Sequence, residues 1–364
     1  MRVLIINFEM DEDSGVLAWQ ASVARRIARH VEAVAVFTER LGHVRRPANM
    51  EIEVMPRRPL GIPRRLGSGW LINPQLFRLC RRFRPDVCFI HMAHEWSYRF
   101  APVLRVLRIP VLMWYAHGSV PLGLRLSTLC ATLCVTSTPE GFRLRTPKLR
   151  VIGQAIDTDL FRIPEDRKPG QDIVYVGRVS RRKRIERLIE AMAIVHGSAA
   201  GKDIRLRIVG PMLTLDDLAY DRELRSSVYA KGLHDAVLFE GFMPQRFTPR
   251  LYRSAFLHLN VSETGSMDKT VMEALACGCP VLTSNPAFRA ALSGYPEFIL
   301  DSSDPGIVAE RIMSLYERRH DYDPERLRAL VVGHHDEEAY VEKILALLRE
   351  LAYPRDPVLG GAVK

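Results

Sequence analysis

The strongest constraint on the fold is an order of local patterns that repeats along the chain. A short run of apolar, β-branched residues is followed by a loop and then by a stretch with the apolar spacing of an amphipathic helix. Residues 3–6, a loop at Gly15 with a helical stretch through residue 29, and residues 33–37 follow this order. Strands that alternate with helices predict a mostly parallel sheet whose two faces are both covered.

The same order continues through the first half of the chain, with further strands predicted at residues 87–90, 110–114 and 133–136. It begins again in the second half, with strands predicted at residues 172–176, 204–209, 237–239, 256–259 and 280–283. One sheet of so many parallel strands would be unusually wide, so two doubly wound domains are predicted. Glycines and prolines interrupt the pattern over residues 151–170. We therefore predict an N-terminal domain over 1–155, a second domain over 156–335, and a last segment over 336–364. This segment carries a helix at 337–351, which could cross back to the first domain, and a loose tail.

Composition excludes several classes of protein. The 364 residues are 47% hydrophobic and 26% charged, which is too apolar for intrinsic disorder. No apolar run reaches the ~18 residues needed to cross a bilayer, and no signal peptide is readable, so we expect a cytoplasmic protein. The six cysteines have neither disulfide-framework density nor paired metal-ligand spacing, and we expect no metal site.

The net charge of +10 is unevenly distributed. Residues 1–150 hold 23 Lys and Arg against 11 Asp and Glu, a balance of +12, and the rest of the chain has a balance of −2. Such a basic half either meets an acidic partner or only improves solubility. Nucleic acid is not expected, because no aromatic residues interleave with the arginines and no recognition motif is present.

Residues 259–283 hold the most informative pattern. A strand ends near residue 261, a polar loop with glycine follows, and a helix is predicted to begin at Asp268 or Lys269 and to carry Glu273 one turn in. The free backbone N–H groups of a helix start bind phosphates or hydroxyls, and a carboxylate suits a ribose diol. The alternative is that Glu273 only caps its helix or pairs with a surface cation.

A basic pattern follows the predicted strand at 172–176. Gly177 and Arg178 come at its carboxyl end, and Lys183 is predicted to begin the next helix. Parallel α/β sheets bind ligands at this edge, and two cations there would stabilise the charge of a leaving diphosphate. The alternative, a solvated charge run, is favoured for the three neighbours Arg181, Arg182 and Arg184.

These residues resemble a known family. The segments 175–178 with Lys183, 208–210, 240–242 and above all 273–281 (EALACGCPV) are similar to the donor half of glycosyltransferase family 4, the group 1 glycosyltransferases of GT-B architecture. Segment 151–161 is similar to the interdomain segment of that family. Resemblance is strong over residues 151–285 and thinner before them.

The resemblance implies an α/β fold of GT-B architecture, with two Rossmann-like domains facing a central cleft. It implies a retaining transfer of a sugar from a nucleotide diphosphate sugar to an acceptor, without a cofactor or a catalytic metal. By position in the family motifs, Arg178 and Lys183 would hold the diphosphate and Glu273 the ribose, with His117 beside the sugar. The other implied donor contacts are Gly15, Gly177, Met243 near the base, and backbone donors from Met267, Asp268, Lys269 and Thr270.

One departure concerns the sugar. The family pattern has two glutamates separated by seven residues, and the first would fall at Gly265, which has no carboxylate. We expect Glu263 or Asp268 to contact the donor hexose instead, unless the loop around Gly265 recognises a different sugar.

His117 follows the predicted strand at 110–114, and a histidine there is often only a core or capping residue. The resemblance favours a hydrogen-bonding role near the sugar, because in this family the departing phosphate is thought to take the acceptor proton. His91 and His94 are weaker candidates for the acceptor side. The acidic triplets at 11–13 and 157–159 match a D-x-D metal pattern but lack further carboxylates, so they are interpreted as loop acids.

The basic first half also suggests where the acceptor lies. Lysines and arginines favour peripheral contact with anionic lipid, so a lipid-linked, polysaccharide or other glycan acceptor at the inner face of a membrane is predicted. Two other classes remain open. An epimerase or phosphorylase on the same architecture would differ by consuming donor without acceptor or by needing a pyridoxal-binding lysine, and a non-catalytic anion-binding protein would need only the charge.

Overall fold

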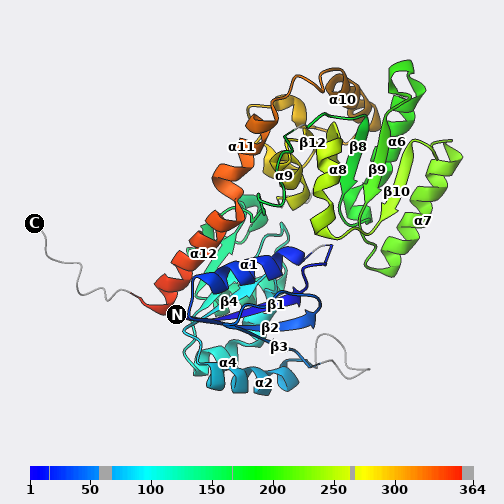
Figure 1. Ribbon diagram of the computed structural model, residues 1–364. Coiled ribbons are helices and arrows are strands. Elements are labelled where there is room, and N and C mark those ends of the chain that lie inside the picture. Colours follow the sequence, from blue (N-terminus) through cyan, green and yellow to red (C-terminus); the bar gives the residue numbers. More distant parts are fainter. Residues whose placement is uncertain (16, 57–67, 166, 263–266, 355–364) are drawn as a thin grey trace, which may run out of the picture. The chain divides into compact units, whose positions relative to one another are not determined.

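The computed structural model describes residues 1–15, 17–56, 68–165, 167–262 and 267–354. The chain forms two compact units (Figure 1). The first consists of Met1–Glu12, Leu17–Gly153 and Glu338–Lys364, and the second of Asp13–Val16 and Gln154–Glu337. Apart from residues 13–16, the chain therefore passes into the second unit at Gln154 and returns to the first at Glu338.

The first unit is built on a seven-stranded parallel sheet in the order β3-β2-β1-β4-β5-β6-β7. The strands are β1 (Arg2–Met10), β2 (Ala33–Leu41), β3 (Met50–Val54), β4 (Val87–His91), β5 (Val111–Trp114), β6 (Leu133–Thr136) and β7 (Leu149–Val151). The two edge strands β3 and β7 were not predicted from the sequence. β3 alternates apolar and acidic residues and is half-exposed, and β7 is three residues long, so neither has the continuous apolar run of a central strand.

The second unit has a five-stranded parallel sheet in the order β10-β9-β8-β11-β12. Its strands are β8 (Asp172–Val176), β9 (Arg205–Val209), β10 (Val237–Gly241), β11 (Leu257–Asn260) and β12 (Val281–Thr283). The strand order reverses between β8 and β11, as it does between β1 and β4 in the first unit. The prediction of two doubly wound α/β units is thus confirmed.

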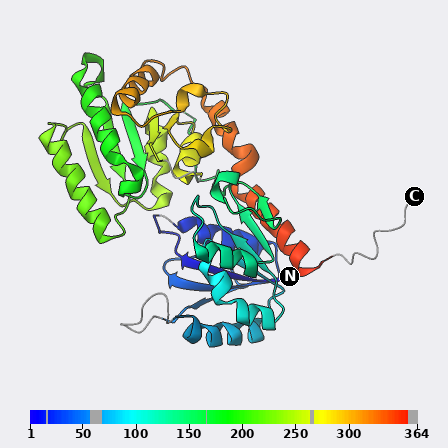
Figure 2. The same cartoon turned by 180° about the vertical axis from the view of Figure 1, so that it is seen from behind.

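Helices connect the parallel strands in both units. The first unit contains α1 (Ala18–Arg29), α2 (Ser68–Phe83), α3 (Glu95–Arg99), α4 (Ala101–Val106), α5 (Leu122–Cys130) and, from Glu338 onward, α12 (Glu337–Ala352). The second contains α6 (Ile185–Gly197), α7 (Leu215–Ala230), α8 (Pro249–Ser254), α9 (Lys269–Ala276), α10 (Pro305–Glu317) and α11 (Pro324–His335). Figure 1 shows α1 in front of the first sheet, and the reverse view in Figure 2 shows cyan helices in front of the same strands.

Burial of the strands on both faces explains their composition. The residues Val3, Leu4, Ile5 and Ile6 of β1 are at most 1% exposed, although they alternate between the two faces. At ~1.5 to 3 kcal/mol for each fully buried aliphatic side chain, such runs dominate the stability of both units. Within the described parts of the chain, no helix is both long and apolar enough to cross a membrane.

α12 packs on the first unit through charged as well as apolar contacts. Glu338 accepts from Arg26 of α1 at 2.7 Å and lies 3.0 Å from the ring of His30. Lys343 donates to the carbonyl of Ile152 at 3.2 Å. The residues Tyr340, Val341 and Ile344 are fully buried, so the helix is part of the fold of the first unit.

Candidate functional site

The residues singled out from the sequence of the second unit gather where its strand order reverses. Gly177 and Arg178 directly follow β8, and the segment leading into α9 follows β11, the neighbour of β8. Open α/β sheets bind ligands at such a switch point, outside the carboxyl ends of the strands. Gly210, at the end of β9, allows the close approach that this edge requires, because a Cβ there would lie 1.8 Å from the carbonyl oxygen of Gly177.

Arg178 is held by a buried carboxylate. Its Nε and Nη2 donate to Oδ2 of Asp217 at 2.8 and 2.7 Å, and Asp217 is 2% exposed. The same carboxylate accepts from the backbone N–H groups of Leu213 and Thr214 at the start of α7. Burial opposes ionisation of Asp217, but the bonds from Arg178 and the backbone outweigh it and lower the pKa. The Arg178 side chain remains 39% exposed, so its guanidinium is oriented and still accessible.

Lys183 is also held by a carboxylate, that of Asp268, which comes from the segment after β11. Its Nζ donates to Oδ1 of Asp268 at 2.9 Å, and Oδ2 of Asp268 accepts from Asn260 of β11 at 2.9 Å. Burial opposes ionisation of Asp268, but Lys183 and the hydrogen bonds lower its pKa. Lys183 does not begin a helix as predicted: it ends a 3-10 turn, and α6 starts at Ile185 because Arg184 has the left-handed φ of 51°.

The side chain of Glu273 is buried inside the second unit. Its Oε1 accepts from Nε2 of Gln245 at 2.7 Å, and its Oε2 accepts from the hydroxyl of Tyr252 at 3.3 Å. Glu273 is only 4% exposed, so the alternative of a surface ion pair is wrong. Burial raises the pKa of its carboxyl, and the nearby Lys269 ammonium and the two hydrogen bonds offset this only in part. The carboxylate is thus desolvated, with fixed donors on both oxygens.

The helix α9 begins at Lys269 with Asp268 as its N-cap residue, as predicted, but Asp268 makes no capping bond because its carboxylate serves Lys183. Lys269 donates to the carbonyl of Ala155, and burial lowers its pKa to about 8 against the attraction of Glu273. The carbonyl of Met267 accepts from Gln154 at 3.2 Å. The side chain of Lys269 is thus directed to the backbone of the second unit, and Thr270 is half-buried.

Met243 lies in the segment after β10, half-buried against the core of the second unit. Gly15 is exposed in the turn that follows β1. Glu263 and Gly265 lie outside the described residues.

His117 is exposed on the first unit, in the segment between β5 and α5. Its backbone N–H donates to Gly141 at 2.8 Å, and its Nδ1 accepts from the backbone N–H of Ser119 at 3.2 Å. A ring nitrogen that accepts carries no proton, so the neutral ring has its proton on Nε2.

The prediction that His91 lies on the acceptor side is wrong. His91 is the last residue of the buried strand β4, is 1% exposed, and packs against Trp19, Phe89 and Trp114.

The acidic triplets take part in local contacts. Asp11 accepts from the backbone of His43, and Glu12 pairs with Arg25 at 3.1 Å. Asp157 accepts from the backbone of Leu160. Within the described ranges, no three His, Cys, Asp or Glu side chains are grouped as metal ligands would be.

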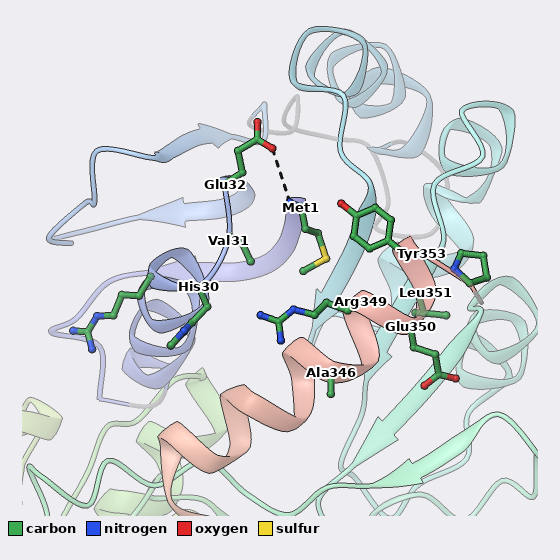
Figure 3. Close-up of a pocket in the computed structure, with 11 residues that line it drawn as sticks. Met1, His30, Val31, Glu32, Ala346, Arg349, Glu350, Leu351 and Tyr353 are labelled. Atoms are coloured by element: carbon green, nitrogen blue, oxygen red, sulfur yellow. Dashed lines mark ion pairs between the residues drawn. The ribbon is translucent and has the colours of Figure 1, made fainter. Parts of the chain in front are cut away.

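A cavity of about 1190 Å³ lies in the first unit, away from these residues (Figure 3). It is lined by the start of β1 at Met1, by His30 and Glu32, and by Arg349 and Tyr353 of the C-terminal helix region. Met1 precedes β1, so the cavity lies at the amino ends of the strands, opposite the edge where parallel sheets bind ligands. It contains no residue that the sequence analysis selected.

Several residues that shape the site were not found from the sequence. Asp217 could have been found from a sequence motif, because Thr214-x-x-Asp217 has the spacing of a capping box, and the structure shows both of the reciprocal hydrogen bonds of that motif. Asn260 could have been suspected only from its position directly after a predicted strand. Gln245 and Tyr252 could not have been found, because nothing in the local sequence pattern indicates that they face Glu273.

Comparisons with known proteins agree with this geometry. Residues 170–318 match the family model described as glycosyl transferases group 1. D-inositol 3-phosphate glycosyltransferase 1 of Catenulispora acidiphila is 28% identical over 235 residues, 59% of this chain and 53% of that protein. Mannosylfructose-phosphate synthase of Agrobacterium fabrum is 25% identical over 137 residues, 37% of this chain and 30% of that protein. The chain thus spans from under a third to about half of these curated relatives.

The fold of the whole chain is also found among solved structures. The Anabaena HepE protein, determined in complex with UDP and glucose, superimposes with a TM-score of 0.77 over 96% of this chain and 99% of that one, at 18% identity. The resemblance to group 1 glycosyltransferases of GT-B architecture is therefore confirmed.

Proposed function

We propose that this chain, whose residues 170–318 match the family model of the group 1 glycosyltransferases, transfers a sugar from a nucleotide diphosphate sugar to an acceptor. The observation that carries the proposal is the pair of cations at the switch point. Arg178 is oriented by the buried carboxylate of Asp217 and Lys183 by the partly buried carboxylate of Asp268, and each cation retains an accessible part. Preorganised cations stabilise a leaving diphosphate without reorganising during the reaction.

In this proposal the donor occupies the carboxyl edge of β8, β9 and β11. Arg178 and Lys183 bind the diphosphate, and Glu273 accepts from the ribose hydroxyls, held for that purpose by Gln245 and Tyr252. Gly15 and Gly177 let backbone approach the phosphates, Met243 lies near the base, and the start of α9 from Met267 to Thr270 supplies N–H donors. The HepE complex with UDP and glucose makes a uridine nucleotide the first donor to test.

We propose a retaining transfer that needs neither a divalent metal nor another cofactor. The two cations meet the charge that develops on the diphosphate as its bond to the sugar breaks. The departing phosphate accepts the proton of the acceptor hydroxyl, and His117 contributes a hydrogen bond from Nε2 rather than a nucleophile. Activity should therefore survive a chelator, and the product should keep the anomeric configuration of the donor.

The proposed acceptor is a lipid-linked, polysaccharide or other glycan that reaches the first unit. The balance of +12 over residues 1–150 supports peripheral contact with an anionic membrane surface, where each nearby Lys or Arg adds ~1 kcal/mol.

A thermal-shift panel of UDP, GDP, ADP, TDP and CMP, with and without EDTA, tests the donor site. A ligand at 100 times its Kd stabilises the folded state by ~2.7 kcal/mol, which is visible as a raised melting temperature. We expect one diphosphate to stabilise, EDTA to change nothing, and Glu273→Gln to remove the shift. Glu190→Ala, on the exposed side of α6, is the control and should keep it. If no nucleotide stabilises the wild type, the proposed function is wrong.

A further inference from the structure

Helix α5 exposes three of its four leucines. Leu122, Leu126 and Leu129 are 72%, 41% and 71% exposed, whereas Leu124, Ser127 and Thr128 are buried. The buried hydroxyls are satisfied: that of Ser127 lies 2.7 Å from the carbonyls of His94 and Gly123, and that of Thr128 donates to the carbonyl of Leu124 at 2.8 Å. The buried Leu124 and these hydrogen bonds therefore set the orientation of α5, and the other three leucines face outward where polar residues are expected.

The three leucines form one continuous stripe. They are spaced four and three residues apart, which places them on one face of a helix, and the exposed Arg125 lies on the same side. Lys148 fixes the C-terminal end of this helix by donating to the carbonyls of Thr128 and Ala131 at 3.0 and 2.8 Å. We call Leu122, Arg125, Leu126 and Leu129 the α5 leucine face.

The charge around the α5 leucine face indicates what covers it. Residues 95–150 hold eight Lys and Arg against two acidic residues, Glu95 and Glu140, a balance of +6. An outward apolar stripe within a basic segment is the combination that binds the interface of an anionic bilayer. A nine-residue helix is ~14 Å long and ~10 Å wide, so its outer face covers only ~140 Å², well below the ~800 Å² that each partner of a stable protein interface buries.

We propose that the α5 leucine face inserts into the surface of an anionic lipid bilayer and docks the first unit there. The leucines enter the boundary between headgroups and acyl chains, and Arg125 stays with the phosphates. His117 lies five residues before α5, so docking brings its segment to the headgroups. Together with the proposed function, on which this last step rests, it favours a lipid-linked acceptor over a soluble glycan.

Flotation of the full chain with vesicles tests the docking. We expect it to float with equimolar phosphatidylglycerol and phosphatidylcholine and much less with phosphatidylcholine alone. The triple variant Leu122→Gln, Leu126→Gln, Leu129→Gln keeps helix propensity and should lower the partition coefficient about tenfold or more. High salt should weaken binding of the wild type only in part, because the apolar contribution is not screened.

A matched control removes three exposed leucines from the second unit. The variant Leu213→Gln, Leu215→Gln, Leu218→Gln changes side chains that are 56%, 84% and 40% exposed, and it should float like the wild type. Equal loss in both triple variants, or none in the α5 variant, would overturn the proposal. So would absence of wild-type binding, or a change of oligomeric state alone in the α5 variant, which would make the face an interface between two copies.

Nucleotide binding separates this proposal from the proposed function. The α5 triple variant should be folded and should keep the melting shift produced by the stabilising nucleotide, since its substitutions lie in the first unit. If vesicles bind but no nucleotide does, the docking surface stands and the transferase proposal fails. If a nucleotide binds but vesicles do not, the docking proposal fails and the transferase proposal stands.

Discussion

Asp217 is the residue on which the orientation of Arg178 depends, and its role can be measured. Asp217→Asn removes the charge that fixes the guanidinium, and a hydrogen bond to a charged group contributes ~1.5 to 3 kcal/mol. We expect the Kd for the stabilising nucleotide to rise about tenfold, measured by calorimetry. Asp216→Asn is the control, because Asp216 lies beside it on α7 but its side chain is 70% exposed. An unchanged Kd in a folded Asp217→Asn protein would contradict this role.

The buried His258 predicts how stability depends on pH. Burial lowers the pKa of its ring to about 4, against a usual value of 6.5. The unfolded chain then binds more protons than the native protein between these values, so His258 costs stability as pH falls from 6.5 toward 4. At pH ~4.5 the loss is about 2 kcal/mol relative to pH 7. His258→Asn can still donate to the Val174 carbonyl, so urea unfolding of this variant should show a shallower pH dependence. Parallel curves for the two proteins would exclude this role.

The position of a single residue was predictable from the sequence where a local motif determines it. It was not predictable where it depends on contacts with residues distant in the sequence. Arg178 could be placed at a strand end, and Lys183 and Asp268 in the segments that follow two strands, because the edge of a parallel sheet is set by local patterns. Their pairing could not, since Lys183 and Asp268 are 85 positions apart. The burial of His91 depends on packing against Trp19 and Trp114, which a single-strand pattern does not contain.

At the scale of elements, the N-cap of α10 can be tested for its contribution to the free energy of unfolding. Asp304 begins α10 and accepts from the N–H groups of Gly306 and Ile307 at 2.9 and 3.3 Å. We expect Asp304→Ala to cost ~1 kcal/mol and to lower the melting temperature by about 2 to 4 °C. Asp301→Ala, which removes only an exposed pair with Arg289, should cost much less. Equal losses would mean that the cap contributes no more than the surface pair does.

Elements were predicted well where one physical rule decided them. The central strands followed from continuous apolar runs, and α9 began where its N-cap residue indicated. The edge strands β3 and β7 were missed because pairing with a neighbour, not burial on both faces, makes them strands. The outward orientation of three α5 leucines was also unpredictable, since apolar spacing gives the direction of a stripe but not whether the protein core lies on that side.

At the scale of the whole molecule, the division into two units predicts where a nucleotide acts. Arg178, Lys183 and Glu273 all belong to the second unit, so a ligand bound by them stabilises that unit against opening. At 100 times its Kd the ligand should slow amide exchange in the strands β8 to β12 by about a hundredfold, because exchange through opening follows the added stability. Amides of β4 and β5 in the first unit should exchange as before.

Exchange mass spectrometry on the full chain measures both units in one sample. Glu273→Gln should abolish the added protection of β8 to β12, which ties the effect to the site rather than to added solute. Equal slowing of β4 and β5 in the wild type would mean that the two units open together. In that case a nucleotide bound to the second unit would also stabilise His117 and α5, and nucleotide binding would be coupled to the stability of the first unit.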